Sequence, residues 1–193
     1  MKRIAQTLTA LFVFIFSLSA FAQTYSTKSY KLTIEGTSTM HDWTSTATQV
    51  TVQADLEVAN GILEKINAAT VTVPAKSIKS NKNSGLMDSR THETLKADKF
   101  PNITYNNVRV TNVQRSGNEA TITVTGNLTI AGVSKPTDLI LKSKVLANGD
   151  VEISGSRKIK MTDHGIKPPV FMMGALKVGD EVKLDFQVVL QKK

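Results

Sequence analysis

Apolar and polar residues alternate along most of this chain with a period of two. In the segment TQVTVQADLEV, every second residue from Val50 to Val58 is apolar, and the residues between them are Gln, Thr, Asp or Glu. The segments TITVTGNLTI and EVKLDFQVVL follow the same rule closely. This period is typical of a strand with one face buried and the other in water. The sequence therefore predicts a protein built mainly of β-strands.

About eight such strands can be placed. Short links at residues 116–118 and 147–150 contain Gly and Asn, which tolerate the backbone of tight turns. Strands joined by such hairpins run antiparallel. The chain shows no internal repeat, linker or low-complexity tract. The predicted strands lie near residues 29–38, 47–59, 65–74, 102–113, 119–131, 137–147, 150–163 and 180–191.

The alternation changes phase within one predicted strand, NITYNNVRV. Its apolar positions are Ile103 and Tyr105, followed by Val108 and Val110. A slip of one residue would turn every later side chain to the other face unless a bulge absorbs it. We therefore expect a β-bulge at residues 106–107.

The segment SGLMDSRTHETLKADKF interrupts the strands and favours one short helix, at about residues 89–97. Asp88 is a residue type that caps helix N-termini, and Pro101 prevents continuation into the next strand. The apolar side of this helix region is formed by Met87, Leu95 and Phe100.

Strand number and strand length indicate the fold class. Eleven or twelve residues at about 3.3 Å each span roughly 36–40 Å. Eight long antiparallel strands close well into a barrel that can hold one small ligand. A two-sheet sandwich with a solid core is the alternative. Inward positions are mostly Val, Ile, Leu and Ala, and such small residues favour a hollow barrel. We predict an all-β, eight-stranded antiparallel barrel with one short helix.

The first 22 residues carry the pattern of a secretory signal peptide. Lys2 and Arg3 precede an apolar run, and Ala20-Phe21-Ala22 is a small-x-small cleavage site before Gln23. An uncleaved membrane anchor is the alternative, but the run is short for a span. We expect a signal peptide at 1–22, one domain at 23–193, and export to the periplasm. The chain has no cysteine, so its stability must come from packing and strand pairing.

The net charge of the chain is +8, or +6 without Lys2 and Arg3. Most of the basic residues are lysines spread along the strands, whereas base recognition in nucleic acids favours arginine. We therefore predict no nucleic-acid binding. Attraction to an anionic ligand, or a transient contact with an acidic membrane surface, fits an exported basic protein better. Whether the protein is a monomer or a homodimer stays open.

Motifs of catalysis are absent from the sequence. It has no phosphate-binding glycine loop, no G-x-S-x-G turn and no cysteine nucleophile. His41, His92 and His164 each neighbour an acid, but their spacing does not require zinc, and local hydrogen bonding explains them more simply. We expect no enzyme activity, no cofactor and no metal.

Two single residues stand out. Arg157 shares a strand face with Val151, Ile153, Ile159 and Met161, and an inward arginine needs a partner. That partner is an acid, the solvent at the barrel rim, or an anionic head group of a ligand. Trp43, the one tryptophan, either plugs a barrel end or lines its mouth.

Several segments in order resemble the YceI-like family. DSRTHETLKADKFPNITY is similar to its Arg–His and Lys-Phe-Pro-x-Ile signature, and VTGNLTIAGVSKPTDLIL to its G-x-L-T-I-x-G-V-x-K-P stretch. GTSTMHDW, KMTDHGI and VGDEVKLDFQV resemble further elements, so the likeness covers most of residues 28–191. The chain departs from the family at Asp163-His164-Gly165, where Asp-Phe-Gly is frequent, and in the loop IKPPVFMMGALK.

This resemblance implies a lipocalin-like barrel in the bacterial periplasm that binds long apolar chains, isoprenoids above all, by hydrophobic lining. The positions that match the signature are Arg90, His92, Lys99, Phe100, Pro101 and Ile103, and their implied role is structural. We therefore expect a non-enzymatic carrier of a polyisoprenoid or similar long-chain lipid. The alternatives are a binder of fatty acids or fatty amides, a stress-related structural or partner-binding module, and a weak hydrolase.

The loop PPVFMMG at residues 168–174 places four apolar residues between prolines and a glycine. It is either a lid over the ligand, for which adaptable methionines are suited, or a cap on the core. The predicted ligand-binding residues are Trp43, Val52, Leu56, Met87, Leu95, Phe100, Ile103, Tyr105, Val124, Leu128, Phe171, Met172, Met173, Leu184 and Phe186.

Overall fold

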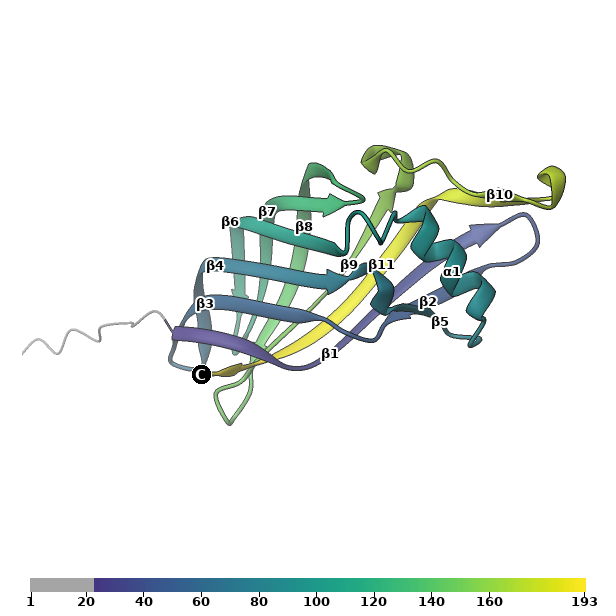
Figure 1. Ribbon diagram of the computed structural model, residues 1–193. Coiled ribbons are helices and arrows are strands. Elements are labelled where there is room, and N and C mark those ends of the chain that lie inside the picture. The colour runs from purple at the N-terminus through teal and green to yellow at the C-terminus, as the bar shows by residue number, and fades with distance from the viewer. Residues whose placement is uncertain (1–22) are drawn as a thin grey trace, which may run out of the picture.

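Eight antiparallel strands close into a barrel in the computed structural model, which describes residues 23–193 (Figure 1). Around the barrel the neighbours are β11, β9, β8, β7, β6, β4, β3 and β1, and pairing of β1 with β11 completes the closure. The predicted fold class is confirmed. The strands are β1 (Gln23–Ser38), β3 (Thr51–Ala59), β4 (Ile62–Pro74), β6 (Asn102–Ser116), β7 (Glu119–Ile130), β8 (Val133–Val145), β9 (Val151–Lys160) and β11 (Leu176–Lys192).

Each predicted strand corresponds to one barrel strand, and the differences at the ends have local causes. β1 begins at Gln23 rather than near Ser29, because its pairing with β11 shifts register between Thr27 and Ser29 and breaks the alternation there. The predicted strand at 47–59 is divided, since Ala47 ends one strand and Thr51 begins the next.

The predicted bulge in β6 is present. The register with β7 shifts between Asn106 and Arg109, and Asn107 has a φ of 53°. Asparagine tolerates this left-handed region better than most residues do. Because of the bulge, Tyr105 before it and Val108 after it both line the barrel interior.

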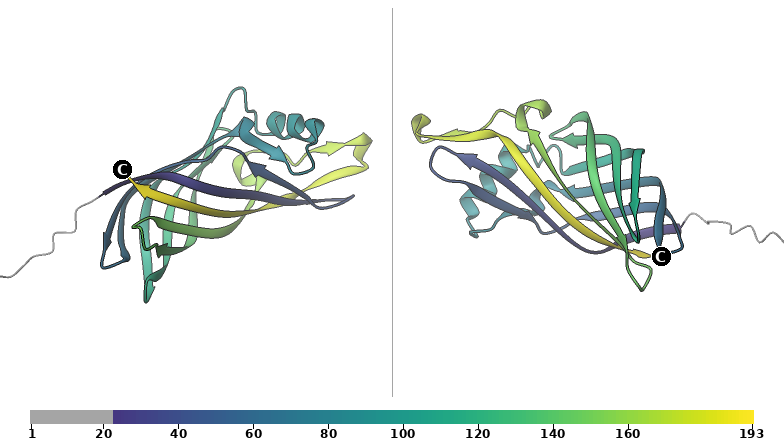
Figure 2. Two further views of the ribbon diagram at one scale, coloured as in Figure 1. Left: turned by 90° about the horizontal axis from the view of Figure 1, so that it is seen from below. Right: turned by 180° about the vertical axis from the view of Figure 1, so that it is seen from behind.

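Beyond the barrel, β1 and β11 continue side by side as a long ribbon, which Figures 1 and 2 show reaching away from the C-terminus. Residues 23–26 of β1 pair with β3, whereas residues 33–36 pair with β2. We call this second region the extension. It contains residues 33–38 of β1, the first residues of β11, and the elements β2 (Trp43–Ala47), β5 (Ile78–Ser80), α1 (Gly85–Thr94) and β10 (Val170–Phe171). Three short 3-10 helices occupy Ala75–Ser77, Met161–His164 and Met172–Gly174.

The helix α1 begins earlier than predicted. Its N-cap is Ser84, whose hydroxyl accepts a hydrogen bond from the Met87 N–H at 3.3 Å, and the helix ends at Thr94. The prediction that Asp88 caps the helix was wrong. Its carboxylate instead accepts a hydrogen bond from the Ser80 N–H of β5, at 2.7 Å.

The core is densest at the barrel end nearest the two termini of the described chain. Tyr25, Leu56, Leu63, Val151 and Leu190 are all at most 2% exposed there. Each buried side chain of this size contributes about 1.5–3 kcal/mol of hydrophobic stabilisation. Within residues 23–193, no helix has the length and apolar character needed to span a membrane.

Candidate functional site

The barrel encloses a cavity of about 190 Å³ whose lining is almost entirely hydrocarbon. Inward positions of all eight barrel strands contribute to it, because successive residues of a strand point to opposite faces. Eight of the predicted ligand-binding residues line this cavity. They are Val52, Leu56, Ile103, Tyr105, Val124, Leu128, Leu184 and Phe186.

Other lining residues were not predicted. β4 contributes Ile66, Ala69, Val71 and Val73, and β8 contributes Leu139 and Leu141. For Val71 and Val73 the signal was in the sequence, since TVTVP alternates as clearly as TQVTVQADLEV. In DLILK three apolar residues follow one another, so the alternation alone does not distinguish the inward Leu139 and Leu141 from the exposed Ile140. The remaining apolar residues of the lining are Tyr30, Leu32, Val50, Ala54, Val108, Ile153, Val188 and Leu190.

The other seven predicted residues lie outside the cavity lining, and Trp43 is the first of them. It belongs to β2 in the extension, where its ring covers Gly36 of β1 so closely that a Cβ there would lie 2.2 Å from it. Its Nε1–H donates to the Thr37 carbonyl at 3.1 Å. Trp43 therefore neither plugs the barrel nor lines its mouth.

Three more of these predicted residues lie in or directly after the helix α1. Met87 lies on α1, which has no buried residue. Leu95 and Phe100, after the helix, are half-buried and pack against the core from outside the cavity. The ring of Phe100 occupies the space beside Gly132, whose φ is 80° and where a side chain would lie 2.4 Å from that ring.

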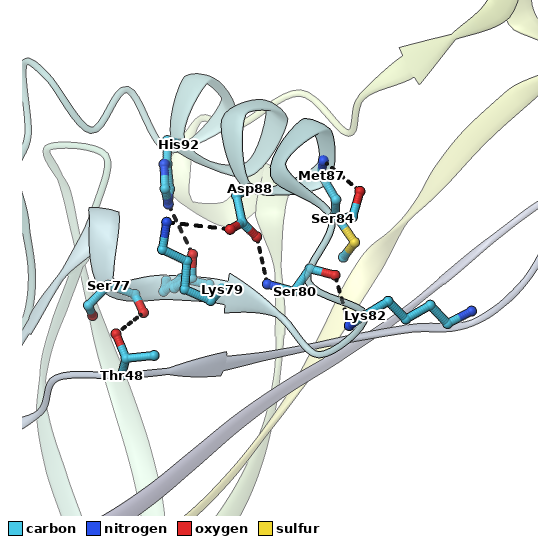
Figure 3. A network of polar contacts seen from close by, with 10 residues as sticks. Thr48, Ser77, Lys79, Ser80, Lys82, Ser84, Met87, Asp88 and His92 are labelled. Atoms are coloured by element: carbon cyan, nitrogen blue, oxygen red, sulfur yellow. Dashed lines mark hydrogen bonds and ion pairs between the residues drawn. The ribbon is translucent and has the colours of Figure 1, made fainter.

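Polar contacts, rather than apolar ones, hold α1 on the sheet (Figure 3). The Asp88 carboxylate meets the Ser80 N–H and, at 3.4 Å, the Lys79 ammonium group. The Ser80 hydrogen bond, with a smaller contribution from Lys79, holds the pKa of Asp88 below its usual value. The Nε2–H of His92 donates to the Ile78 carbonyl at 2.9 Å. β5 and α1 are thus joined by a hydrogen-bond network.

The loop at 168–174 forms part of a hairpin at the far end of the extension. Phe171 pairs with Leu176 of β11, and the Arg90 guanidinium lies 5.4 Å from its ring centroid. Met172 and Met173 are 68% and 110% exposed. They neither belong to the core nor lie among the residues that line the cavity, so the core-cap interpretation was wrong. Their contact with a bound ligand stays a prediction.

Tyr105 is the main polar group deep in the cavity wall. Its hydroxyl donates to the Thr137 carbonyl at 2.9 Å. Burial raises the pKa of Tyr105 to about 12, the nearby Asp138 carboxylate adds to this, and the Arg157 charge opposes it. The phenol therefore stays neutral at ordinary pH and its proton is already engaged.

Arg157 lines the cavity, as the phase of β9 predicts, and its side chain reaches solvent at the rim. Opposite it on β11 stands Leu184, another lining residue. In the described part of the chain, no acidic group lies within ion-pairing distance of Arg157. The solvent at the rim is therefore the partner that the structure shows.

The barrel wall is incomplete beside the cavity. The β8–β9 ladder runs from Val145 and Val151 only to Leu141 and Gly155, although β9 continues to Lys160. The β4–β6 ladder is limited to residues 71–74 of β4. At these two places the neighbouring strand edges are not joined by ladder hydrogen bonds.

A larger hollow of about 830 Å³ lies outside the barrel, between the extension and β8, β9 and β11. Its lining mixes lysine, threonine, serine and acidic residues, and it is open to solvent. Such a groove offers little desolvated apolar surface, so the smaller interior cavity is the better candidate for an apolar ligand.

The three histidines do not form a cluster. His164 is 2% exposed, and its Nδ1–H donates to the Val133 carbonyl at 3.1 Å, whereas His41 is exposed in the β1–β2 loop. Among residues 23–193, no three His, Asp or Glu side chains gather in a way that could hold a metal ion.

Comparison with known proteins supports one family over most of the chain. The family model described as the YceI-like domain matches residues 23–190. The protein named YceI of Salmonella arizonae is 33% identical over 114 residues, which are 55% of this chain and 54% of that protein. The chain thus spans about half the length of the curated relatives it matches.

Three solved structures share the fold at low sequence identity. A polyisoprenoid binding domain from Saccharophagus degradans, implicated in plant cell wall breakdown, has a TM-score of 0.66 at 13% identity, covering 89% of this chain and 99% of that one. BcnA of Burkholderia cenocepacia has a TM-score of 0.64 at 16% identity, covering 83% and 95%. The YceI protein of Campylobacter jejuni has a TM-score of 0.58 at 22% identity, covering 77% and 84%.

Proposed function

Because this chain belongs to the YceI-like family, we propose that it is a non-enzymatic periplasmic carrier that holds a long apolar lipid, a polyisoprenoid above all, inside its barrel. The observation that carries this proposal is the cavity of about 190 Å³ whose lining is almost entirely hydrocarbon. A dry apolar cavity disfavours polar ligands, and each methylene group of a ligand that it buries contributes about 0.8 kcal/mol to the free energy of binding. The polyisoprenoid-binding description of the Saccharophagus relative supports the choice of cargo.

The size of the cavity defines how such a lipid would fit. Ligand pockets usually measure about 300–1,000 Å³, so 190 Å³ accommodates only part of a long chain. The remainder must widen the barrel or emerge where the β8–β9 and β4–β6 ladders stop. We therefore expect affinity to climb with chain length at first and to level off once the cavity is filled.

A titration of the delipidated protein with prenols of increasing length tests this. Affinity that does not change with length would contradict the proposal. Ala69→Phe fills the cavity, since Ala69 lines it, and should weaken the longer prenols at least tenfold. The matched control is Ala68→Phe, because its neighbour Ala68 is exposed on the outer face of β4. Equal loss in both variants would also contradict the proposal.

Mass spectrometry of an organic extract from the freshly purified protein identifies the cargo. A polyisoprenoid supports the proposal, whereas a fatty acid or fatty amide would favour the alternative ligand class. Absence of any copurifying lipid, together with no prenol binding, would favour the structural or partner-binding alternative.

The periplasmic location rests on the pattern of residues 1–22, which lie outside the described residues. The lysine and arginine start, the apolar run and the Ala20-Phe21-Ala22 site support it. N-terminal sequencing of the protein from a periplasmic fraction should give Gln23, and a Met1 start in the cytoplasmic fraction would contradict it.

A carrier must also collect its lipid, and we include a transient contact with a membrane surface in the proposal. Five of the exposed large apolar side chains support it, since they lie in or beside the extension: Met40, Leu86, Val170, Met172 and Met173. Cosedimentation with vesicles of phosphatidylglycerol and phosphatidylethanolamine checks this, with vesicles of phosphatidylcholine as the uncharged comparison.

A further inference from the structure

Two basic residues line the cavity, and they differ in orientation. Lys31 pairs with Gln187 across the β1–β11 ladder, and both also line the outer groove. Arg157 lines the cavity alone and has no place in that groove. It shares the inward face of β9 with the buried residues Val151 and Ile153. The exposed side chain of Arg157 thus adjoins an apolar chamber whose wall is almost entirely hydrocarbon.

In the described part of the chain, no acidic side chain neutralises the positive charge of Arg157. The carboxylate of Asp138, which like Arg157 affects the pKa of Tyr105, accepts a hydrogen bond from Thr125 at 2.6 Å. Within residues 23–193, Arg157 has no ion pair. The Tyr105 hydroxyl is engaged by Thr137. The donors of Arg157 therefore remain free for an external acceptor.

The hydrogen-bonded ladder between β8 and β9 ends beside Arg157. The β8–β9 ladder stops at Gly155, two residues before it, where the Phe186 ring lies 2.6 Å from the position of a Cβ. Beyond that point β9 has no ladder partner in β8, and Arg157 is exposed. A chain that occupied the cavity and emerged at this gap would carry its end group past the guanidinium.

We propose that Arg157 binds an oxyanion head group, a carboxylate or a phosphate, of a lipid whose chain fills the cavity. This inference rests on the proposed lipid-binding function and assigns the chemical class of the head group. The planar guanidinium group matches two oxygens of such a group with two parallel hydrogen bonds. At the rim it stays hydrated while the site is empty, which avoids the cost of burying an unpaired charge.

The test uses the delipidated protein and three probes with the same chain: geranylgeraniol, geranylgeranic acid and geranylgeranyl monophosphate. The wild-type protein should bind both anionic probes at least tenfold more tightly than the alcohol. Arg157→Gln should remove that preference and leave the affinity for the alcohol within about twofold. Arg157→Lys should keep part of it, because a lysine retains the charge and loses the fork geometry.

Arg109→Gln is the matched control. Arg109 is exposed on β6 and, like Arg157, has no ion pair in the described chain, but it does not line the cavity. The Arg109→Gln variant should keep the preference for the two anionic probes. Equal loss in the two Gln variants would show general charge attraction and overturn the proposal.

The results distinguish the head-group site at Arg157 from the carrier function of the barrel. Binding of the alcohol without any preference for the anionic probes overturns the role of Arg157 and leaves the apolar carrier intact. Failure of all three probes to bind overturns the carrier itself and the head-group site with it. A preference for one anion over the other identifies whether the carboxylate or the phosphate is the better match.

Discussion

The barrel and the extension share two strands, β1 and β11, and are stabilised in different ways. At the closed end of the barrel, Tyr25, Leu63 and Val151 are at most 2% exposed and pack as hydrocarbon. In the extension, α1 has no buried residue, and it is joined to β5 by Asp88, Lys79 and His92. One region depends on apolar area removed from water, and the other on hydrogen bonds whose net contribution is smaller. A continuous ribbon therefore need not have uniform stability along its length.

The largest expected change in stability comes from a comparison of the same Leu→Ala substitution in the barrel and in the extension. Leu63→Ala in β4 should lower the free energy of unfolding by about 2–5 kcal/mol, because it leaves a cavity in a packed core. Leu86→Ala on α1 should change it by less than about 0.5 kcal/mol, since Leu86 is 71% exposed. Urea midpoints measure both. Similar losses in the two variants would remove the distinction between the regions.

Asp88→Asn should have the next largest effect, about 1–3 kcal/mol at pH 7, since it weakens a charged hydrogen bond that joins α1 to β5. The Ser80 N–H, followed by Lys79, holds the pKa of Asp88 below its ordinary value of 3.8. The carboxylate is therefore favoured by folding, and its contribution is complete above the unfolded pKa and lost as pH falls through the lower folded pKa. The difference between wild type and variant should shrink on acidification below about pH 4.

Urea titrations of both proteins at pH 7 and pH 3 measure this effect. Asp42→Asn serves as the control, because Asp42 is exposed in the β1–β2 loop, and it should change stability at pH 7 by less than about 0.5 kcal/mol. A difference between wild type and Asp88→Asn that grows on acidification would have the wrong sign.

Ser84→Ala tests the local cap of α1 and should cost about 1 kcal/mol, because one N-terminal N–H loses its acceptor. Ser89→Ala, at an exposed position inside the same helix, should cost nothing, since alanine is the better helix former. Hydrogen exchange of the α1 amides reports the effect locally. Equal destabilisation by the two changes would argue against Ser84 as the cap.

The smallest stability effect is expected for Met172→Ser combined with Met173→Ser. Both side chains are exposed at the hairpin tip, so the urea midpoint of the delipidated protein should change by less than about 0.5 kcal/mol. A large drop would mean that the tip packs somewhere in the fold. Affinity for geranylgeraniol, measured on the same protein, decides the lid hypothesis: weaker binding supports it, and unchanged binding rejects it.

The same division explains what the sequence could predict. Half-buried strands leave a period of two, so the eight barrel strands and the β6 bulge followed from the alternation alone. β2, β5 and β10 have five, three and two residues, which is too short for a period to be recognised. The cap of α1 was misplaced because Ser84 and Asp88 are both capping residue types, and the contact with Ser80 that engages Asp88 is tertiary.

The predictions of ligand-binding residues also differ between regular strands and irregular segments. Residues chosen by strand phase, such as Val124 and Phe186, line the cavity. Residues chosen because they were apolar in a loop or helix, such as Trp43 and Met173, lie elsewhere. Apolarity alone does not give direction in an irregular segment, because no repeating geometry relates the sequence position to a side of the fold.

The pairing of β1 with β11 also affects how the chain reaches its fold. The first described strand finds its longest partner in the last one, from Tyr25 opposite Lys192 to Ser38 opposite Val178. A chain that emerges from its N-terminus can pair the strands from β3 to β9 in order, but the barrel stays open until β11 is available. Closure therefore requires the most distant contact in the sequence, which makes folding slow and leaves apolar strand faces exposed meanwhile. Loss of β11 would leave an open sheet in which β1 and β9 each have an unpaired edge, and such edges can pair with other chains.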